Sequence, residues 1–231
     1  MRENDIKIKR SIVSAICNNA PGSIKSVELC GTRRKSLYKT IESLVAAVEA
    51  KDKYTEGHSR RVSEYAVMIA QGMGFSKEHV ESIRLAGILH DIGKIGIRDS
   101  IILNPGKLTP DEYEEIKKHP LISGKILGSV GLSEMIINTI TFHHERYDGK
   151  GYPFCLSKNK INIEAQIVSV ADAFDAMTSR RSYKKAMTKN QAIKELIRCK
   201  GTQFNPVVVD TMVKIMNISE KHSKTDTPRA V

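Results

Sequence analysis

The chain has 231 residues, of which 40% are hydrophobic, and a formal net charge of +11. This length allows one large domain or one domain with a short appendage, and the composition permits a sizeable core. No apolar run is long enough to span a bilayer, and the polar N-terminus lacks the apolar centre of a secretory signal. We therefore expect a cytoplasmic protein that has no membrane segment.

The positive charge suits an anionic partner, either a nucleic acid or a small anion such as a nucleotide. Tryptophan is absent and aromatic residues make up only 5% of the chain, which disfavours a surface that stacks on successive bases of a nucleic acid. No helix-turn-helix or zinc-finger pattern is found either. We therefore do not expect nucleic acid as the partner. The four cysteines form no C-x-x-C pair and fit reduced thiols in a cytosol.

The chain divides into three segments on its pattern of apolar and polar residues. Residues 1–36 read as a short N-terminal extension, with apolar residues at helical spacing and then a Pro21-Gly22-Ser23 break. From residue 37 to residue 218 the helical period dominates, beginning with a helix over 37–51. The polar residues 219–231 are predicted to form a disordered tail.

The large segment shows few strand signals. Thr109-Pro110-Asp111-Glu112 is a typical helix start, and we expect that helix to run to His119-Pro120. Apolar residues at helical spacing predict further helices over 58–72, 76–91, 132–144, 163–178, 189–198 and 206–216. The sequence therefore predicts an all-α bundle of seven or more helices.

Five of the seven histidines fall in four short clusters, three of which stand beside acids or glycines. These clusters are His58, His90-Asp91, His119 and His143-His144. Histidine and aspartate bind divalent transition metals, and a site with two such ions can cleave phosphate esters. One histidine on an apolar face is more often an ordinary core residue, but this combination is difficult to explain by packing. It predicts a metal site.

Three further charged residues belong to the same hypothesis. Asp172 stands within the apolar stretch 167–174, where a buried carboxylate needs a partner such as a metal. Asp175, one helical turn later, is expected to support the site or to lie on the helix surface rather than to bind metal. Lys94 follows His90 by four residues and would lie near the same face if the helix persisted, where its ammonium could hold a phosphate oxygen.

The order of these motifs resembles a known family. The His90-Asp91 pair, the spaced histidines and the later aspartate resemble the HD phosphohydrolase superfamily, and Gly151-Tyr152-Pro153 narrows the resemblance to the HD-GYP family. The resemblance covers residues 44–211 and implies an HD-domain helical bundle. It also implies a phosphodiesterase that converts cyclic di-GMP to pGpG or GMP with a hydroxide activated by two metal ions, usually iron or manganese. The implied metal ligands are His58, His90, Asp91, His119, His143, His144 and Asp172, with Asp91 as the bridge.

The resemblance also implies roles in substrate and partner binding. Lys94 would contact the scissile phosphate and Asp52 would orient it, while Arg181 and Lys184 would hold the second phosphate or a guanine. Some family members bind a third metal through a glutamate where this chain has Tyr54, so we expect two ions. A loop that could dock a diguanylate cyclase of the GGDEF type contains Asp148, Gly149, Gly151, Tyr152 and Pro153. The two glycines would let this loop approach a substrate or partner closely, and a homodimer is a further expectation.

The chain departs from the family pattern at Arg98, Arg180 and Ser182, where proline, aspartate and proline are common. These changes affect the expected rigidity and affinity of the substrate loop and leave the metal ligands intact. Two alternatives stay open. The chain could hydrolyse another cyclic dinucleotide or a nucleotide ester, or it could be a nucleotide-binding signalling adaptor with weak catalysis.

Overall fold

The structure is a computed structural model that describes residues 41, 43, 45, 46, 48, 49, 57–104, 106–129, 131–179 and 186–225, the last eight without side chains. The chain separates into two compact units, Met1–Leu44 and Val45–Val231, and the second contains all of the helices named below. The predicted N-terminal extension and the predicted site residues Asp52, Arg181 and Lys184 lie outside the described residues.

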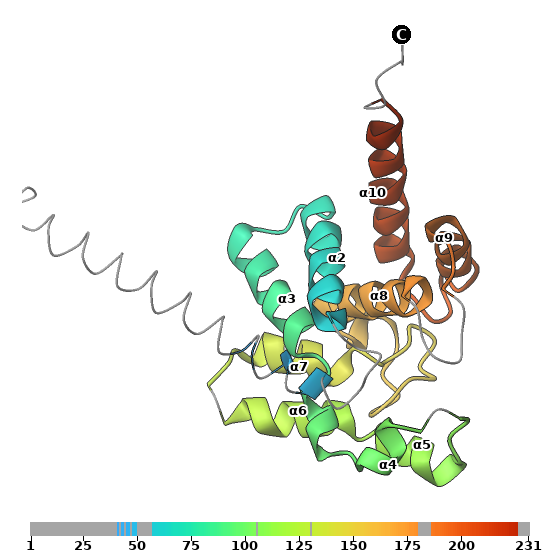
Figure 1. The fold of residues 1–231 in the computed structure, drawn as a ribbon. Coiled ribbons are helices and arrows are strands. Elements are labelled where there is room, and N and C mark those ends of the chain that lie inside the picture. The colour runs from blue at the N-terminus through green and yellow to red at the C-terminus, as the bar shows by residue number, and fades with distance from the viewer. Residues whose placement is uncertain are drawn as a thin grey trace, which may run out of the picture. The chain divides into compact units, whose positions relative to one another are not determined.

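Helices account for nearly all of the regular structure in the described ranges, which contain no β-strand beyond an isolated bridge between Lys200 and Phe204. The all-α prediction is therefore confirmed (Figure 1). The helices are α2 (His58–Gly72), α3 (Lys77–Leu89), α4 (Asp99–Ile102), α5 (Pro110–Ile116), α6 (His119–Gly128), α7 (Glu134–Phe142), α8 (Ile163–Thr178), α9 (Lys189–Arg198) and α10 (Pro206–Thr225). Two short 3-10 helices are η1 (Ile92–Gly96) and η2 (Lys158–Lys160).

The helix boundaries follow local sequence signals. The bounds of α2, α8 and α9 are those that the apolar spacing predicts. Helix α5 begins with the expected capping box, in which Thr109 Oγ1 accepts from the Glu112 amide at 3.3 Å and Glu112 Oε2 accepts from the Thr109 amide at 2.8 Å. Each bond satisfies a backbone N–H group that would otherwise have no hydrogen-bond partner at the start of the helix.

The prediction of one helix from Thr109 to Pro120 is wrong, because α5 ends at Ile116 and a new helix, α6, begins at His119. Pro120 occupies the first turn of α6, where the missing backbone N–H would have no intrahelical partner. The proline therefore marks the start of a helix rather than the end of one. Helix α3 also ends at Leu89, earlier than expected, and α10 continues past Met216 to Thr225.

The apolar core lies where α2, α3, α8, α9 and α10 pack on one another. Phe174 is fully buried, and its ring meets Tyr65 edge-on at a centroid distance of 4.9 Å. Other fully buried members of this cluster are Val62, Ile69, Ile83, Val170, Leu196 and Met212. A Cβ at Gly87 would lie 2.9 Å from Ser63 Cα, so glycine allows α3 to approach α2 closely. This contact holds the end of α3 at the centre of the unit.

Within the described part of the chain, no helix has the length and apolar character needed to cross a membrane. The cytoplasmic location that the sequence suggested stays a prediction.

Candidate metal centre

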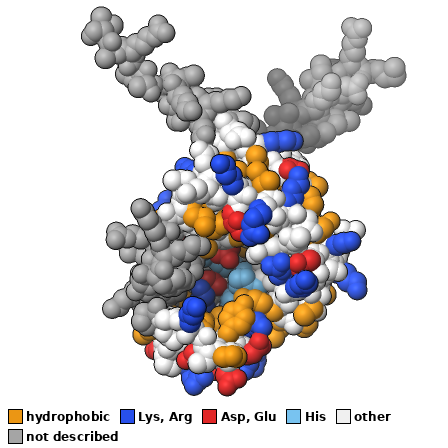
Figure 2. Space-filling view, turned by 90° about the vertical axis from the view of Figure 1, so that its right-hand side faces the viewer, with side chains coloured by type: hydrophobic (Ala, Val, Ile, Leu, Met, Phe, Trp, Pro, Cys, Tyr) orange, Lys and Arg blue, Asp and Glu red, His pale blue; other side chains and the backbone are white. Residues whose placement is uncertain are grey.

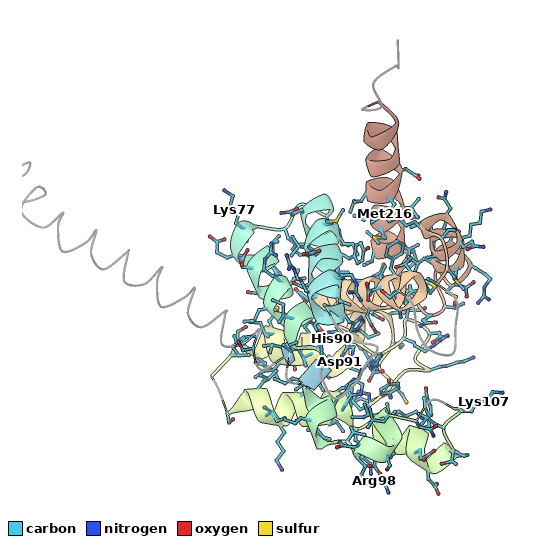
Figure 3. The ribbon with its side chains drawn as sticks, in the orientation of Figure 1. Lys77, His90, Asp91, Arg98, Lys107 and Met216 are labelled. Atoms are coloured by element: carbon cyan, nitrogen blue, oxygen red, sulfur yellow. The ribbon has the colours of Figure 1, made fainter. Side chains whose placement is uncertain are left out.

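The structure brings the seven predicted metal ligands together, and six of them stand at helix ends. Asp172 is the exception, because it lies within α8. The others are His58 at the start of α2, His90 and Asp91 at the end of α3, His119 at the start of α6, and His143 and His144 after α7. Figure 3 shows His90 and Asp91 at the inner end of α3. Helix α3 packs on α7, and α6 packs on both α7 and η1, so these ends converge.

Three histidines are oriented by the same backbone contact. In each, Nδ1 lies within hydrogen-bond distance of the carbonyl three residues earlier: His90 to Gly87 at 2.8 Å, His119 to Ile116 at 2.8 Å and His143 to Ile140 at 2.6 Å. A carbonyl only accepts, so Nδ1 must carry the proton. The lone pair is therefore on Nε2, the tautomer that a metal ligand requires.

The Nε2 atoms of these three histidines are buried and have no hydrogen-bond partner among the described residues. A buried polar atom without a partner costs roughly 1–3 kcal/mol, so three in one place call for an explanation. His119 Nε2 lies 3.2 Å from Asp91 Oδ1, but the geometry is not that of a hydrogen bond. A cation between the histidines and the carboxylate would satisfy all of these atoms.

Asp91 stands between two groups of possible ligands. Its Oδ2 lies 3.4 Å from His90 Nε2 and 3.8 Å from His58 Nε2, while its Oδ1 faces His119. In each group, the ligand atoms lie within 4.8 Å of one another; one group is His58, His90 and Asp91, and the other is Asp91, His119, His143 and His144. The residues present thus fit two metal ions that share one carboxylate.

His58 is held on both ring nitrogens by carboxylates of α8. Its Nε2 lies 3.2 Å from Asp172 Oδ1, and its Nδ1 lies 2.8 Å from Asp175 Oδ2. Asp175 is buried and also accepts from Arg61 Nε at 2.6 Å. Its contact with Nδ1, away from the other ligands, agrees with the supporting role that the sequence suggested. A carboxylate on Nδ1 fixes the ring and strengthens Nε2 as a ligand.

The electrostatics keep most of these imidazoles neutral. Burial, with neighbouring histidines, lowers the pKa of His90, places that of His143 well below its usual range and brings that of His144 to about 3. Burial also lowers the pKa of His58, but hydrogen bonds to Asp172 and Asp175 outweigh it and raise the value to about 9. A proton on His58 therefore occupies the place that a metal ion would take between the carboxylates.

The two central carboxylates stay ionised despite burial. Burial raises the pKa of Asp91, but Lys94 and the nearby histidines outweigh it and hold the pKa well below its usual range. Burial also raises the pKa of Asp172, but its hydrogen bond to His58 outweighs this effect, so the pKa lies below its usual range. Neutral imidazoles and ionised carboxylates are the ligand forms that divalent ions require.

Lys94 lies near the centre, as the sequence suggested, but it is not placed there by a continuation of α3. Helix α3 does not persist, and η1 instead places Lys94 Nζ 2.6 Å from Asp91 Oδ2. Gly93 is needed there, because a Cβ on it would overlap the His119 carbonyl oxygen, and its N–H donates to Ser123 Oγ at 2.8 Å. Gly93 thus lets η1 lie against α6, which sets the separation of Asp91 from His119.

The predicted loop around Gly151-Tyr152-Pro153 packs on the histidine pair. The Tyr152 ring lies against His144, with centroids 4.8 Å apart and an interplanar angle of 33°. A Cβ on Gly151 would overlap the Arg146 amide, so the close approach that glycine permits is to the chain's own backbone rather than to a substrate. At the other end of the loop, Asp148 pairs with Arg146 at 2.8 Å.

Two glutamates were missed by the sequence analysis. The buried Glu145 accepts from the amides of Phe154 at 2.6 Å and Leu156 at 2.9 Å, and so it holds the loop beside the histidine pair. Glu49 accepts from the amides of Gly57 at 2.9 Å and Ser59 at 2.8 Å, on either side of His58. The position of Glu145 directly after His144 was a signal for the first, whereas Glu49 had none beyond its helical spacing.

The centre opens to the surface through a hollow. Figure 2 shows this hollow with histidine side chains at its floor and hydrophobic side chains along its rim. A small pocket also reaches the candidate ligands, and it is lined by residues that include Val48, His58, Asp91, Lys94 and Ile102. A small ligand can therefore reach the candidate ligands from solvent.

Comparison with known proteins identifies the family. The sequence model of the family described as "HD domain" matches residues 42–208. The response regulator RpfG of Xanthomonas campestris, named as a cyclic di-GMP phosphodiesterase, is 43% identical over 178 residues, which are 76% of this chain and 47% of that protein. A cyclic di-GMP phosphodiesterase of Thermotoga maritima is 41% identical over 181 residues, or 78% of this chain and 49% of that protein. The chain thus spans about half the length of these relatives.

Solved structures share the fold. An HDG"Y"P protein of Bdellovibrio bacteriovorus matches with a TM-score of 0.58 and 22% identity, over 69% of this chain and 51% of that one. A cyclic GMP-AMP specific phosphodiesterase of Vibrio cholerae matches with a TM-score of 0.61 and 18% identity, over 81% of this chain and 51% of that one. The chain belongs to the HD domain family, and its His90-Asp91 pair followed by Gly151-Tyr152-Pro153 places it in the HD-GYP group.

Proposed function

We propose that this chain is a metal-dependent phosphoric diester hydrolase that converts cyclic di-GMP to pGpG or GMP. The observation that carries the proposal is the set of three buried, unpartnered Nε2 atoms around the Asp91 carboxylate. Relatives that are 41–43% identical and are named as cyclic di-GMP phosphodiesterases support the choice of substrate.

Two divalent ions would be held by the ligand set around the shared Asp91. Imidazole with carboxylate suits iron and manganese, and we propose one of these. The members of the set are His58, His90, Asp91, His119, His143, His144 and Asp172. When bound, such ions supply Lewis-acid stabilisation of a phosphate and a nucleophile at neutral pH.

The chain's own residues prepare this site in three ways. Backbone carbonyls fix the histidine tautomers, so the rings need no reorientation when ions bind. Asp175 holds His58, and η1 places Lys94 beside Asp91. We propose that Lys94 contacts the scissile phosphate and neutralises charge that develops there. The orienting role of Asp52 and the substrate contacts of Arg181 and Lys184 stay predictions.

The direct test replaces both members of the His90-Asp91 pair with alanine. The protein is purified anaerobically, its metal content is measured, and products of cyclic di-GMP are separated by chromatography with and without chelator. The wild type should contain metal and give chelator-sensitive pGpG or GMP, and the double variant should lose both. His79→Gln is the matched control, because His79 lies on the same helix but its Nε2 contacts Glu164 at 2.6 Å. Full hydrolysis by the double variant would refute the proposal.

A second substrate is favoured by other relatives. The 3'3'-cGAMP-specific phosphodiesterase 2 of Vibrio cholerae is 32% identical over 210 residues, which are 90% of this chain and 40% of that protein. Turnover of cyclic di-GMP and cyclic GMP-AMP should therefore be measured side by side. Nucleotide binding without turnover in metal-loaded protein would instead favour the adaptor reading.

We also propose that the loop around Tyr152 docks a GGDEF-type diguanylate cyclase, and we retain the homodimer as a prediction. Phe154, next to Pro153, is 55% exposed, so the loop offers an apolar contact to a partner. Phe154→Ser should weaken capture of a purified cyclase without changing hydrolysis.

A further inference from the structure

Two tyrosine rings and one lysine lie together at the edge of the metal centre. Tyr113 belongs to α5, Lys117 caps the end of that helix, and Tyr152 comes from the loop after α7. Lys117 Nζ lies 4.8 Å from the centroid of the Tyr113 ring and 5.9 Å from that of the Tyr152 ring. One ammonium therefore contacts two aromatic rings from separate parts of the chain.

Tyr152 connects this group to the candidate metal ligands. Its ring lies against His144 at 4.8 Å. From the centre outward the order is His144, Tyr152, Lys117 and Tyr113.

Tyr113 is 48% exposed, although a ring that only filled the core would be buried. A tyrosine and a lysine four residues apart are common on helix surfaces, and such a pair alone would carry no weight. Here Tyr152 approaches the same lysine from a distant segment. Lys117 Nζ also contacts Glu114 Oε1 at 2.5 Å, which holds the ammonium near the rings. The group is therefore an aromatic and cationic cluster that lies beside His144.

Aromatic rings next to a cation match the chemistry of a purine nucleotide. A purine stacks on an aromatic face, and an ammonium can donate to the O6 and N7 acceptors of guanine. We propose that Tyr113, Lys117 and Tyr152 form a subsite for one purine base of the cyclic dinucleotide, with Lys117 favouring guanine over adenine. This inference rests on the proposed function, because it assumes that the phosphate of the same ligand lies at the metal centre.

Binding at this subsite can be observed separately from hydrolysis. The chain contains no tryptophan, so Tyr113→Trp introduces a single reporter. Metal-loaded Tyr113→Trp protein is mixed with cyclic di-GMP in a stopped-flow fluorimeter, and a stacked guanine should quench the indole emission saturably. Val207→Trp is the matched control, since Val207 is 60% exposed at the start of α10 and is not part of the proposed subsite. Equal quenching of both variants would overturn the inference.

Steady-state kinetics provide the second measurement. Tyr113→Ala should raise KM for cyclic di-GMP about tenfold, the size of one lost base stack, while kcat changes far less. Tyr113→Phe keeps the ring and should recover most of the lost affinity. Lys117→Met should raise KM for cyclic di-GMP more than for cyclic di-AMP.

The two proposals fail in different ways. Quenching at position 113 without product would support the subsite and refute the hydrolase. Product without quenching, and with an unchanged KM in Tyr113→Ala, would refute the subsite and leave the hydrolase intact. Neither quenching nor product would refute both.

Discussion

The chain has two buried regions, the apolar core and the candidate metal centre, and these two interiors differ in how their buried atoms are satisfied. In the apolar core, side chains such as Val62, Ile69 and Phe174 are fully buried within one cluster of apolar residues. In the metal centre, His90 and His143 are equally buried, yet their Nε2 atoms have no partner among the described residues. The core is complete with the chain alone, whereas the candidate centre leaves buried Nε2 atoms that the proposed cations would satisfy. Stability and function should therefore be separable by mutation.

Helix α8 shows how one helix serves both interiors. Asp172 and Asp175 are three residues apart, so they share a face, and both contact His58. Phe174 points away from that face into the apolar core. A change on one face of α8 should therefore leave the other face largely unaffected.

The largest effect is expected from Phe174→Ala. This ring is fully buried, so its loss leaves a cavity and should lower the free energy of unfolding by about 3–5 kcal/mol. Urea denaturation in the presence of chelator measures this change without any contribution from metal. The folded fraction should still bind metal as the wild type does. A loss of stability below about 1 kcal/mol would show that the core relaxes around the cavity.

Metal that binds at the candidate centre should raise the free energy of unfolding of the wild type. Manganese at a free concentration one hundred times its Kd should add about 2.7 kcal/mol, since only the folded chain presents the ligands together. Calorimetric melting curves with and without manganese measure the shift. Phe174→Ala should show the same increment, and the variant lacking His90 and Asp91 should show none. A metal-dependent shift in that variant would place the ions elsewhere.

The two interiors also differ in how far the sequence predicted them. The period of apolar residues predicts α2, α8 and α9 because each buries one face along its whole length. Helix α6 was missed because Pro120 can end a helix or occupy its first turn, and only tertiary packing decides. In the centre, the clustered histidines predicted the convergence of the ligands. The position of Glu145 beside His144 marked that residue, but the hydrogen-bond partners of Glu49 and Glu145 could not be predicted, because only the fold sets the relative positions of the segments that they join.

A smaller effect is expected from Asp175→Asn. The change weakens the hold on His58 Nδ1, and contacts of this kind typically alter metal affinity by about 10–100-fold. Isothermal titration of metal-free protein with manganese measures the affinity. Glu64→Gln is the matched control, since Glu64 pairs with Arg60 on the exposed side of α2. Equal affinities in the two variants would mean that Asp175 only supports packing.

The smallest effect concerns a pair that belongs to neither interior. The hydrogen bond from Arg146 lowers the pKa of Asp148 to about 2. Because this folded-state pKa lies below the unfolded value of about 3.9, the pair stabilises the chain above about pH 4, and the stabilisation is lost as the pH falls towards 2. Both side chains are partly exposed, so Asp148→Asn should lower the free energy of unfolding by only about 0.5 kcal/mol at pH 7.

Denaturation of wild type and Asp148→Asn from pH 7 down to pH 2 tests this assignment. The two curves should converge at low pH, because the wild-type carboxylate then takes up its proton and the charge on Asp148 is lost in both proteins. Arg146→Met removes the other partner and should show the same convergence. A difference that stayed constant with pH would mean that the charge of Asp148 does not account for its contribution to stability.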